Sequence, residues 1–273
     1  MPDRAARRET RVSSLSDTPT RTLKLTISYD GTRFVGWQRQ AAGVSIQGLL
    51  EDALARFEGV PVAVNGAGRT DAGVHALGQV ASARMASVQP VDSVARGLNA
   101  CLPPNVRVLD IQEVAADFHA RFSARSKTYR YHLQTSAVAS PFEQDYVWHV
   151  PETLDVDAMR AAAHALVGTH DFAAFQSTGS DTKGTIRTII ESEIGERAVE
   201  GWRDSPAPLL VYEVSGDGFL RHMVRAIVGT LVEVGRGRRR ESSIAALLAG
   251  GNRSHAGVTA PPQGLFLVRV VYD

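Results

Sequence analysis

The feature of the sequence that most restricts the fold is one order of strand and helix patterns that occurs twice. In residues 23–114, alternating residues and apolar helical faces predict a strand, a helix, two strands, a second helix and a last strand. Residues 127–272 repeat this order, with one additional short helix before the final strand. A βαββαβ order is typical of ferredoxin-like units. We therefore predict an α+β protein of two ferredoxin-like halves, with antiparallel sheets side by side, helices on one face and the active site in the cleft between them.

The composition adds a tail to these two halves. Residues 1–21 combine arginines with serine, threonine and aspartate and have few large apolar side chains, so we expect a disordered basic tail. The two halves are assigned to residues 22–116 and 117–273. No apolar run approaches the roughly 20 residues that a bilayer requires, and the N-terminus lacks a signal-peptide core. We expect a cytoplasmic protein with no membrane partner.

Single residues predict several element ends. Ser45 is expected to cap a helix that Gly59 terminates. A strand is predicted over residues 79–85, directly after a glycine-rich segment. Cys101 is the only cysteine, which excludes an intramolecular disulfide, and we expect it to be a small buried side chain in the second helix.

The basic residues are clustered although the formal net charge is only +1. Clusters lie at residues 33–39, 121–130 and 236–240, and the first two contain tryptophan, phenylalanine or tyrosine. Each cluster alone is compatible with a solvated surface. Together with the aromatic rings they favour RNA, because aromatic faces stack on unpaired bases while arginines hold phosphates.

The glycine-rich segment, residues 66–75, reads GAGRTDAGVH. It is not a dinucleotide-binding loop, because the glycine spacing differs from G-x-G-x-x-G and the next element is a strand where that loop requires a helix. The chain also lacks C-x-x-C, H-E-x-x-H, P-loop and G-x-S-x-G patterns. From spacing alone, Asp71 fits either a turn residue that bonds its own backbone or an ionised nucleophile beside Arg69.

Residues 68–75, GRTDAGVH, resemble the signature loop of the tRNA pseudouridine synthase A family. Seven further blocks resemble that family in the same order, and together they extend from about residue 23 to the end of the chain. These blocks are YDG (29–31), GWQRQ (36–40), SIQ (45–47), DFHARF (117–122), YRY (129–131), HMVR (222–225) and GLFL (264–267).

The resemblance implies isomerisation of uridine to pseudouridine at positions 38, 39 and 40 in the anticodon stem and loop of tRNA. It also implies a homodimer that uses no metal and no small-molecule cofactor. Asp71 would be the nucleophile, and attack on ribose C1′ and attack on uracil C6 both stay open. Base flipping would present the target uridine to this carboxylate.

The resemblance also implies roles for three further residues. Tyr129 would stack on the target uracil and handle the C5 proton, Arg69 would occupy the space left by the flipped base or contact phosphate, and Arg225 would hold Asp71 ionised. Without the resemblance, Tyr129 also fits a packed strand tyrosine, and both arginines fit solvated surface charges. His75 is expected to be structural.

Two rival hypotheses remain open. Paired ferredoxin-like halves also describe a non-catalytic RNA-binding module, but such domains carry an aromatic RNP1 strand that the sequence lacks. A different RNA target for the same chemistry is the second rival.

Overall fold

A computed structural model describes residues 20–177, 184–197 and 209–273. The expected disordered tail therefore lies outside the described residues except for Thr20 and Arg21, and Arg21 is already the first residue of a strand. The first six elements are β1 (Arg21–Tyr29), α1 (Ile46–Glu58), β2 (Val64–Gly66), β3 (His75–Met85), α2 (Val91–Cys101) and β4 (Val106–Val114).

The remaining elements follow the predicted order with short additions. They are β5 (Ser126–Gln134), β6 (Trp148–His149), α3 (Val156–His164), β7 (Gly168–Asp171), β8 (Ile186–Arg197), β9 (Leu209–Gly216), α4 (Met223–Gly235), α5 (Ser243–Leu248) and β10 (Leu265–Val271). Single 3-10 turns occur at Ala173–Phe175, Arg253–His255 and Pro262–Gly264. The two short strands β6 and β7 and these turns were not predicted.

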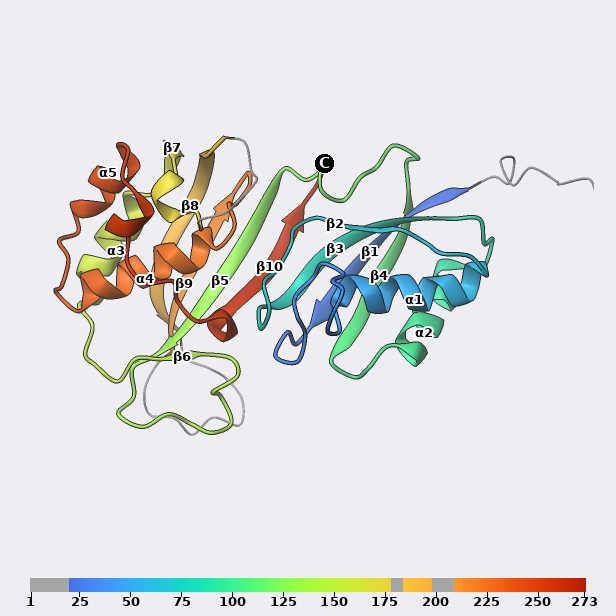
Figure 1. Ribbon diagram of the computed structural model, residues 1–273, viewed down its shortest axis with the longest axis horizontal. Coiled ribbons are helices and arrows are strands. Elements are labelled where there is room, and N and C mark those ends of the chain that lie inside the picture. Colours follow the sequence, from blue (N-terminus) through green and yellow to red (C-terminus); the bar gives the residue numbers. More distant parts are fainter. Residues whose placement is uncertain (1–19, 178–183, 198–208) are drawn as a thin grey trace, which may run out of the picture.

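All strands in the described residues belong to one ten-stranded sheet, which runs through the whole molecule in Figure 1. Its main order is β4-β1-β3-β10-β5-β9-β8-β7, while β2 pairs with β3 and β6 pairs with β5. The strands of the first six elements meet those of the rest through the parallel pair β3 and β10, where His75 is opposite Phe266. The predicted neighbouring sheets are therefore continuous across this pair. α1 and α2 accompany one end of the sheet, and α3, α4 and α5 accompany the other.

The local signals explain the elements of the N-terminal end of the sheet. In β1 the alternating side chains Leu23, Leu25 and Ile27 are fully buried, as a strand with one apolar face requires. The Ser45 side chain accepts a hydrogen bond from Gly48 N, and Gly59 adopts φ 70° at the end of α1. Both predicted caps of α1 are confirmed.

The predicted start of β3 and the predicted burial of Cys101 are wrong. β3 begins at His75, four residues earlier than expected, because its first residues pair with β10 and with Tyr29 of β1. These partners are distant in sequence, so local alternation does not reveal them. Cys101 is exposed at the last position of α2, where Val94 and Leu98 form the buried face. Cys101 follows Val94 and Leu98 at the spacing of one helical face, so periodicity favoured its burial; it differs from them in lying at the end of the helix.

α4 is the most deeply buried of the described helices, with eleven of its thirteen residues buried. The segment that precedes β10 packs tightly on it: a Cβ on Gly229 would lie 1.7 Å from Val258 O, so only glycine fits there. Thr230 Oγ1 also accepts a hydrogen bond from Gly257 N. This packing fixes the middle of α4 against the segment that leads into β10. No helix in the described ranges has the length and apolar character needed to cross a membrane.

Candidate active site

The glycine-rich loop, residues 67–74, connects β2 to β3 and is held by hydrogen bonds to its backbone. Gln79 Nε2 donates to Gly68 O at 2.8 Å, and Trp37 N donates to Thr70 O at 3.0 Å. Val74 N donates to Asp71 O at 3.2 Å and closes a turn. The loop backbone is therefore fixed on both sides of Asp71.

The segment that precedes α1 packs against this loop. Gly36 adopts φ 106°, and a Cβ there would lie 2.6 Å from Thr70 O. A Cβ on Gly66 would lie 2.4 Å from the Trp37 ring. Glycine is required at both positions, because a side chain would displace the loop or the tryptophan. The GWQRQ block thus acts as a support for the loop that carries Asp71.

A buried polar contact fixes the side chain of Thr70, which is part of the loop. Its hydroxyl lies 2.8 Å from Tyr29 Oη, and Gln79 Nε2 donates to the same Tyr29 oxygen at 3.4 Å. Burial raises the pKa of Tyr29 to about 12, so its hydroxyl is protonated at neutral pH. Thr70 consequently anchors the residue immediately before Asp71.

His75 anchors the other end of the loop. Its Nδ1 accepts a hydrogen bond from Gly31 N at 3.1 Å, so Nε2 carries the proton and donates to Asp145 O at 2.9 Å. The ring stacks on Phe266 with centroids 4.7 Å apart. Burial lowers the pKa of His75 and favours the neutral form. These contacts are those of a structural residue.

Asp71 lies in the loop that leads into β3, the strand that joins the two parts of the sheet by pairing with β10. Arg225 Nη1, from the first turn of α4, donates to Asp71 Oδ2 at 3.1 Å, which is the pairing expected from the sequence. Arg225 Nε donates to Ala260 O at 2.7 Å, so the guanidinium is held independently of the carboxylate. The side chain of Asp71 is 28% exposed and that of Arg225 is 13% exposed. The carboxylate is therefore both oriented and accessible.

His222 also contacts Asp71 and was not predicted. Its Nε2 lies 3.4 Å from Asp71 Oδ2. His222 caps α4 with φ 62°, the one positive φ of a non-glycine residue in the described parts of the chain. Burial lowers the pKa of His222, although the Asp71 charge opposes the shift. Backbone strain of this kind is typical of functional sites, but it leaves no local sequence pattern.

Tyr129 is on β5, next to Gly68 of the loop. Its hydroxyl oxygen would be 3.4 Å from a Cβ on Gly68, and its ring meets Phe219 edge-on with centroids 5.0 Å apart. Burial raises the pKa of Tyr129 above its usual range, and the negative charge of Asp71 acts in the same direction. Tyr129 is thus a neutral hydroxyl close to the carboxylate.

Two basic residues complete the surroundings of the loop. Lys127 is on the same face of β5 as Tyr129, and its Cδ would lie 3.8 Å from a Cβ on Gly68. Burial lowers the pKa of Lys127. Arg69 is exposed and forms no hydrogen bond or ion pair with another residue that the structure describes. Asp71, Tyr129 and Arg225 are therefore gathered at one place, whereas Arg69 extends from its edge.

The site thus contains an oriented and partly exposed carboxylate beside basic residues, and comparisons with known proteins identify the family. A family model described as tRNA pseudouridine synthase matches residues 25–123 and 162–273. tRNA pseudouridine synthase A of Syntrophotalea carbinolica is 46% identical over 92% of this chain and 96% of that protein. The enzymes of the same name from Myxococcus xanthus and Solibacter usitatus are 49% and 46% identical, each over 92% of this chain and over 91% and 100% of their own lengths. The chain belongs to the tRNA pseudouridine synthase family.

Proposed function

We propose that this protein converts uridine to pseudouridine at positions 38, 39 and 40 in the anticodon stem and loop of tRNA. The observation that carries the proposal is the carboxylate of Asp71. It is partly exposed, accepts a hydrogen bond from Arg225, and lies on a loop whose backbone is fixed by hydrogen bonds. Family membership supplies the class of reaction and of substrate.

Asp71 is the proposed nucleophile, and Arg225 keeps one of its oxygens aligned so that the other is free to attack. The target uridine is flipped out of its stack to reach the carboxylate. Attack occurs at ribose C1′ or at uracil C6. In both routes the C1′–N1 bond breaks, a C1′–C5 bond forms, and the bond that Asp71 formed breaks again to release the carboxylate. The C5 proton is lost while N1 gains one. The exchange is redox-neutral and calls for no metal or organic cofactor.

The other proposed residues act on the displaced base. The Tyr129 ring stacks on the target uracil, and its hydroxyl takes part in removing the C5 proton, a role supported by its position beneath Gly68. Arg69 is exposed at the edge of the loop, where it can occupy the space left by the flipped base or contact a phosphate.

We also propose the finer architecture of the fold. Residues 22–116 and 117–273 form two ferredoxin-like halves with helices on one face, and the substrate lies in the cleft between them. The strand orders β4-β1-β3-β2 and β10-β5-β9-β8 support this division, since each is the 4-1-3-2 order of one βαββαβ unit. The contact of Asp71 with Arg225 across the two halves supports the position of the active site. We include a homodimer that acts in the cytoplasm, as the family resemblance implies.

The proposal is tested by incubating the purified protein with tRNA that carries uridine at positions 38 to 40 and separating the nucleosides after digestion. Chromatography is needed because the product has the same mass as uridine. Pseudouridine is expected in this tRNA, and none in a matched tRNA with cytidine at the three positions. Binding of the first tRNA without any pseudouridine would instead favour a non-catalytic RNA-binding module.

A further inference from the structure

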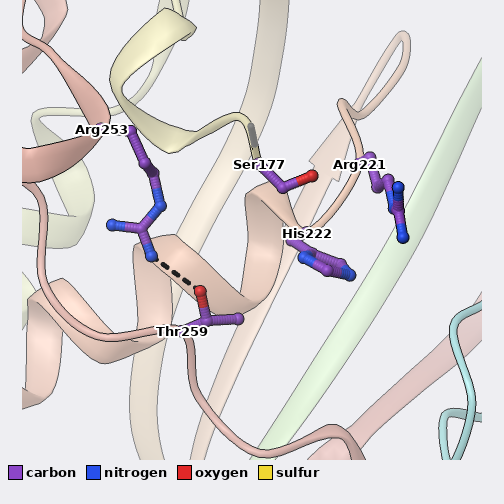
Figure 2. Close-up of a pocket in the computed structure, with 5 residues that line it drawn as sticks. All are labelled: Ser177, Arg221, His222, Arg253 and Thr259. Carbon is purple, nitrogen blue, oxygen red and sulfur yellow. Dashed lines mark hydrogen bonds between the residues drawn. The ribbon is translucent and has the colours of Figure 1, made fainter. Parts of the chain in front are cut away.

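A basic pocket opens beside Asp71 and has no assigned role in the proposed reaction. Figure 2 shows its five lining residues. The volume of the cavity is about 420 Å³. We call it the arginine pocket. It is lined by Ser177, Arg221, His222, Arg253 and Thr259.

The lining of the arginine pocket is cationic and rich in hydrogen-bond donors. None of its five residues is acidic, and two are arginines. Arg253 donates to Gly257 O at 2.8 Å and to Thr259 Oγ1 at 2.7 Å, so two of its five donors fix the guanidinium. Three donors then remain without a partner in the described chain. Because Thr259 Oγ1 accepts from Arg253, its own proton is also available to a ligand.

The remaining lining residues extend this set of donors. The Arg221 side chain is exposed and forms no hydrogen bond or ion pair with the described residues. The Ser177 hydroxyl is buried and lacks a partner among the same residues. Ser177 N donates to Arg221 O at 3.1 Å, which ties the two sides of the pocket together. A buried hydroxyl without a partner is costly, and an anion at this place would accept its proton.

His222 connects the arginine pocket to the nucleophile. The same imidazole lines the pocket and lies 3.4 Å from Asp71 Oδ2. A ligand in the pocket is therefore separated from the carboxylate by one side chain. The left-handed backbone of His222 makes this placement possible, since it turns the chain between Arg221 and the first residue of α4.

We propose that the arginine pocket binds a backbone phosphodiester next to the target nucleotide and so sets which uridine reaches Asp71. The inference rests on the proposed function, because it takes RNA as the substrate. Arginine pairs and hydroxyls are suited to the tetrahedral oxygens of a phosphate. The volume is within the range of small-molecule sites, roughly 300–1,000 Å³, and exceeds what a single phosphate needs, so it leaves room for part of the attached ribose.

The arginine pocket has a positioning role in this reaction. A phosphate contact carries no base information but fixes the register of the nucleic acid on the protein. With one phosphate held by Arg221 and Arg253, the neighbouring ribose is placed over the loop that carries Asp71. Loss of this contact should therefore raise KM more than it lowers kcat.

The test combines a protein change with a change in the RNA. Anticodon-arm RNAs are synthesised with one neutral methylphosphonate linkage, placed in turn at each position around the target uridine. Steady-state kinetics are measured for the wild type, for Arg221→Gln and Arg253→Gln, and for Arg96→Gln as the matched control. Arg96 is exposed on α2 at the other end of the sheet and is bonded only locally, to Ser93.

At one linkage the neutral RNA should lower the kcat/KM of the wild type about tenfold, the loss expected for one charge-assisted hydrogen bond. Arg221→Gln should lose part of this factor with the natural RNA and should show a smaller loss than the wild type at that linkage, because Arg253 still contacts the phosphate. For this variant, the slope of log KM against log salt concentration should be smaller by about 0.7 than for the wild type. This is the change expected for one lost phosphate contact to a single strand. Arg96→Gln should behave as the wild type.

Two results would overturn the inference while leaving the proposed function intact. One is an unchanged kcat/KM for both Arg221→Gln and Arg253→Gln. The other is a loss on neutralisation that is the same in these variants as in the wild type at every linkage, which would place the phosphate elsewhere or indicate a pocket for an unrelated anion. A wild type that forms no pseudouridine in any RNA would overturn the proposed function itself, and this inference with it.

Discussion

Replacing Arg225 by glutamine should separate the alignment of Asp71 from its chemical identity. The arginine is 13% exposed and donates from Nη1 to Asp71 Oδ2 at 3.1 Å. A hydrogen bond between charged groups contributes about 1.5–3 kcal/mol. If that alignment is lost in the transition state, kcat should fall roughly 10- to 150-fold. KM should change little, because Arg225 contacts the nucleophile rather than the RNA.

The assay is single-turnover formation of pseudouridine at saturating tRNA, with the thermal unfolding of each variant measured in parallel. Arg225→Lys is the matched control: it retains the charge, but one ammonium cannot hold both Ala260 O and Asp71 as the guanidinium does. Its loss should be smaller than that of Arg225→Gln. A folded Arg225→Gln with the kcat of the wild type would refute the reasoning, since Asp71 would then need no alignment by this residue.

Three further predictions concern the loop and its supports. Gly36→Ala places a Cβ 2.6 Å from Thr70 O at a positive φ, so it should lower the free energy of unfolding by about 1–3 kcal/mol in urea titrations; unchanged stability would contradict this packing. Tyr129→Phe should retain the wild-type unfolding midpoint but lose roughly 100-fold or more in kcat, and full activity would exclude its hydroxyl from the proton transfer. His75 has a folded-state pKa below its ordinary 6.5, so the unfolded chain binds its proton more readily and stability should decrease as the pH falls through about 6.5. His75→Gln should flatten this part of the pH profile of unfolding, and an unchanged profile would assign the dependence to other groups.

The sequence predicted the elements whose signals are local. The Ser45 and Gly59 caps of α1 and the alternation in β1 depend on neighbouring residues, and both were confirmed. The early start of β3 depends on pairing with β10, which is nearly 200 residues away, and the short strand β6 exists only through its pairing with β5. Local patterns contain no information about such partners.

In the site, too, contacts between residues distant in sequence could not be predicted from local patterns. Asp71, Tyr129 and Arg225 lie in blocks that resemble the family, and the structure brings them together. His222 lies in one of these blocks too, but its contact with Asp71 depends on a left-handed backbone that residues other than glycine rarely adopt. Arg253 and Thr259 reach the arginine pocket only because residues 257–260 pack against α4. Their assembly is a property of tertiary packing and not of spacing.

Conversion of Asp71 to asparagine tests the central claim most directly. The substitution preserves size and leaves an oxygen that can still accept from Arg225, but it removes the nucleophilic carboxylate. Pseudouridine is measured by chromatography of nucleosides from tRNA after prolonged incubation, with tRNA binding measured on the same preparation. The account predicts bound tRNA and no pseudouridine. Turnover near the wild-type rate would show that Asp71 is not the nucleophile.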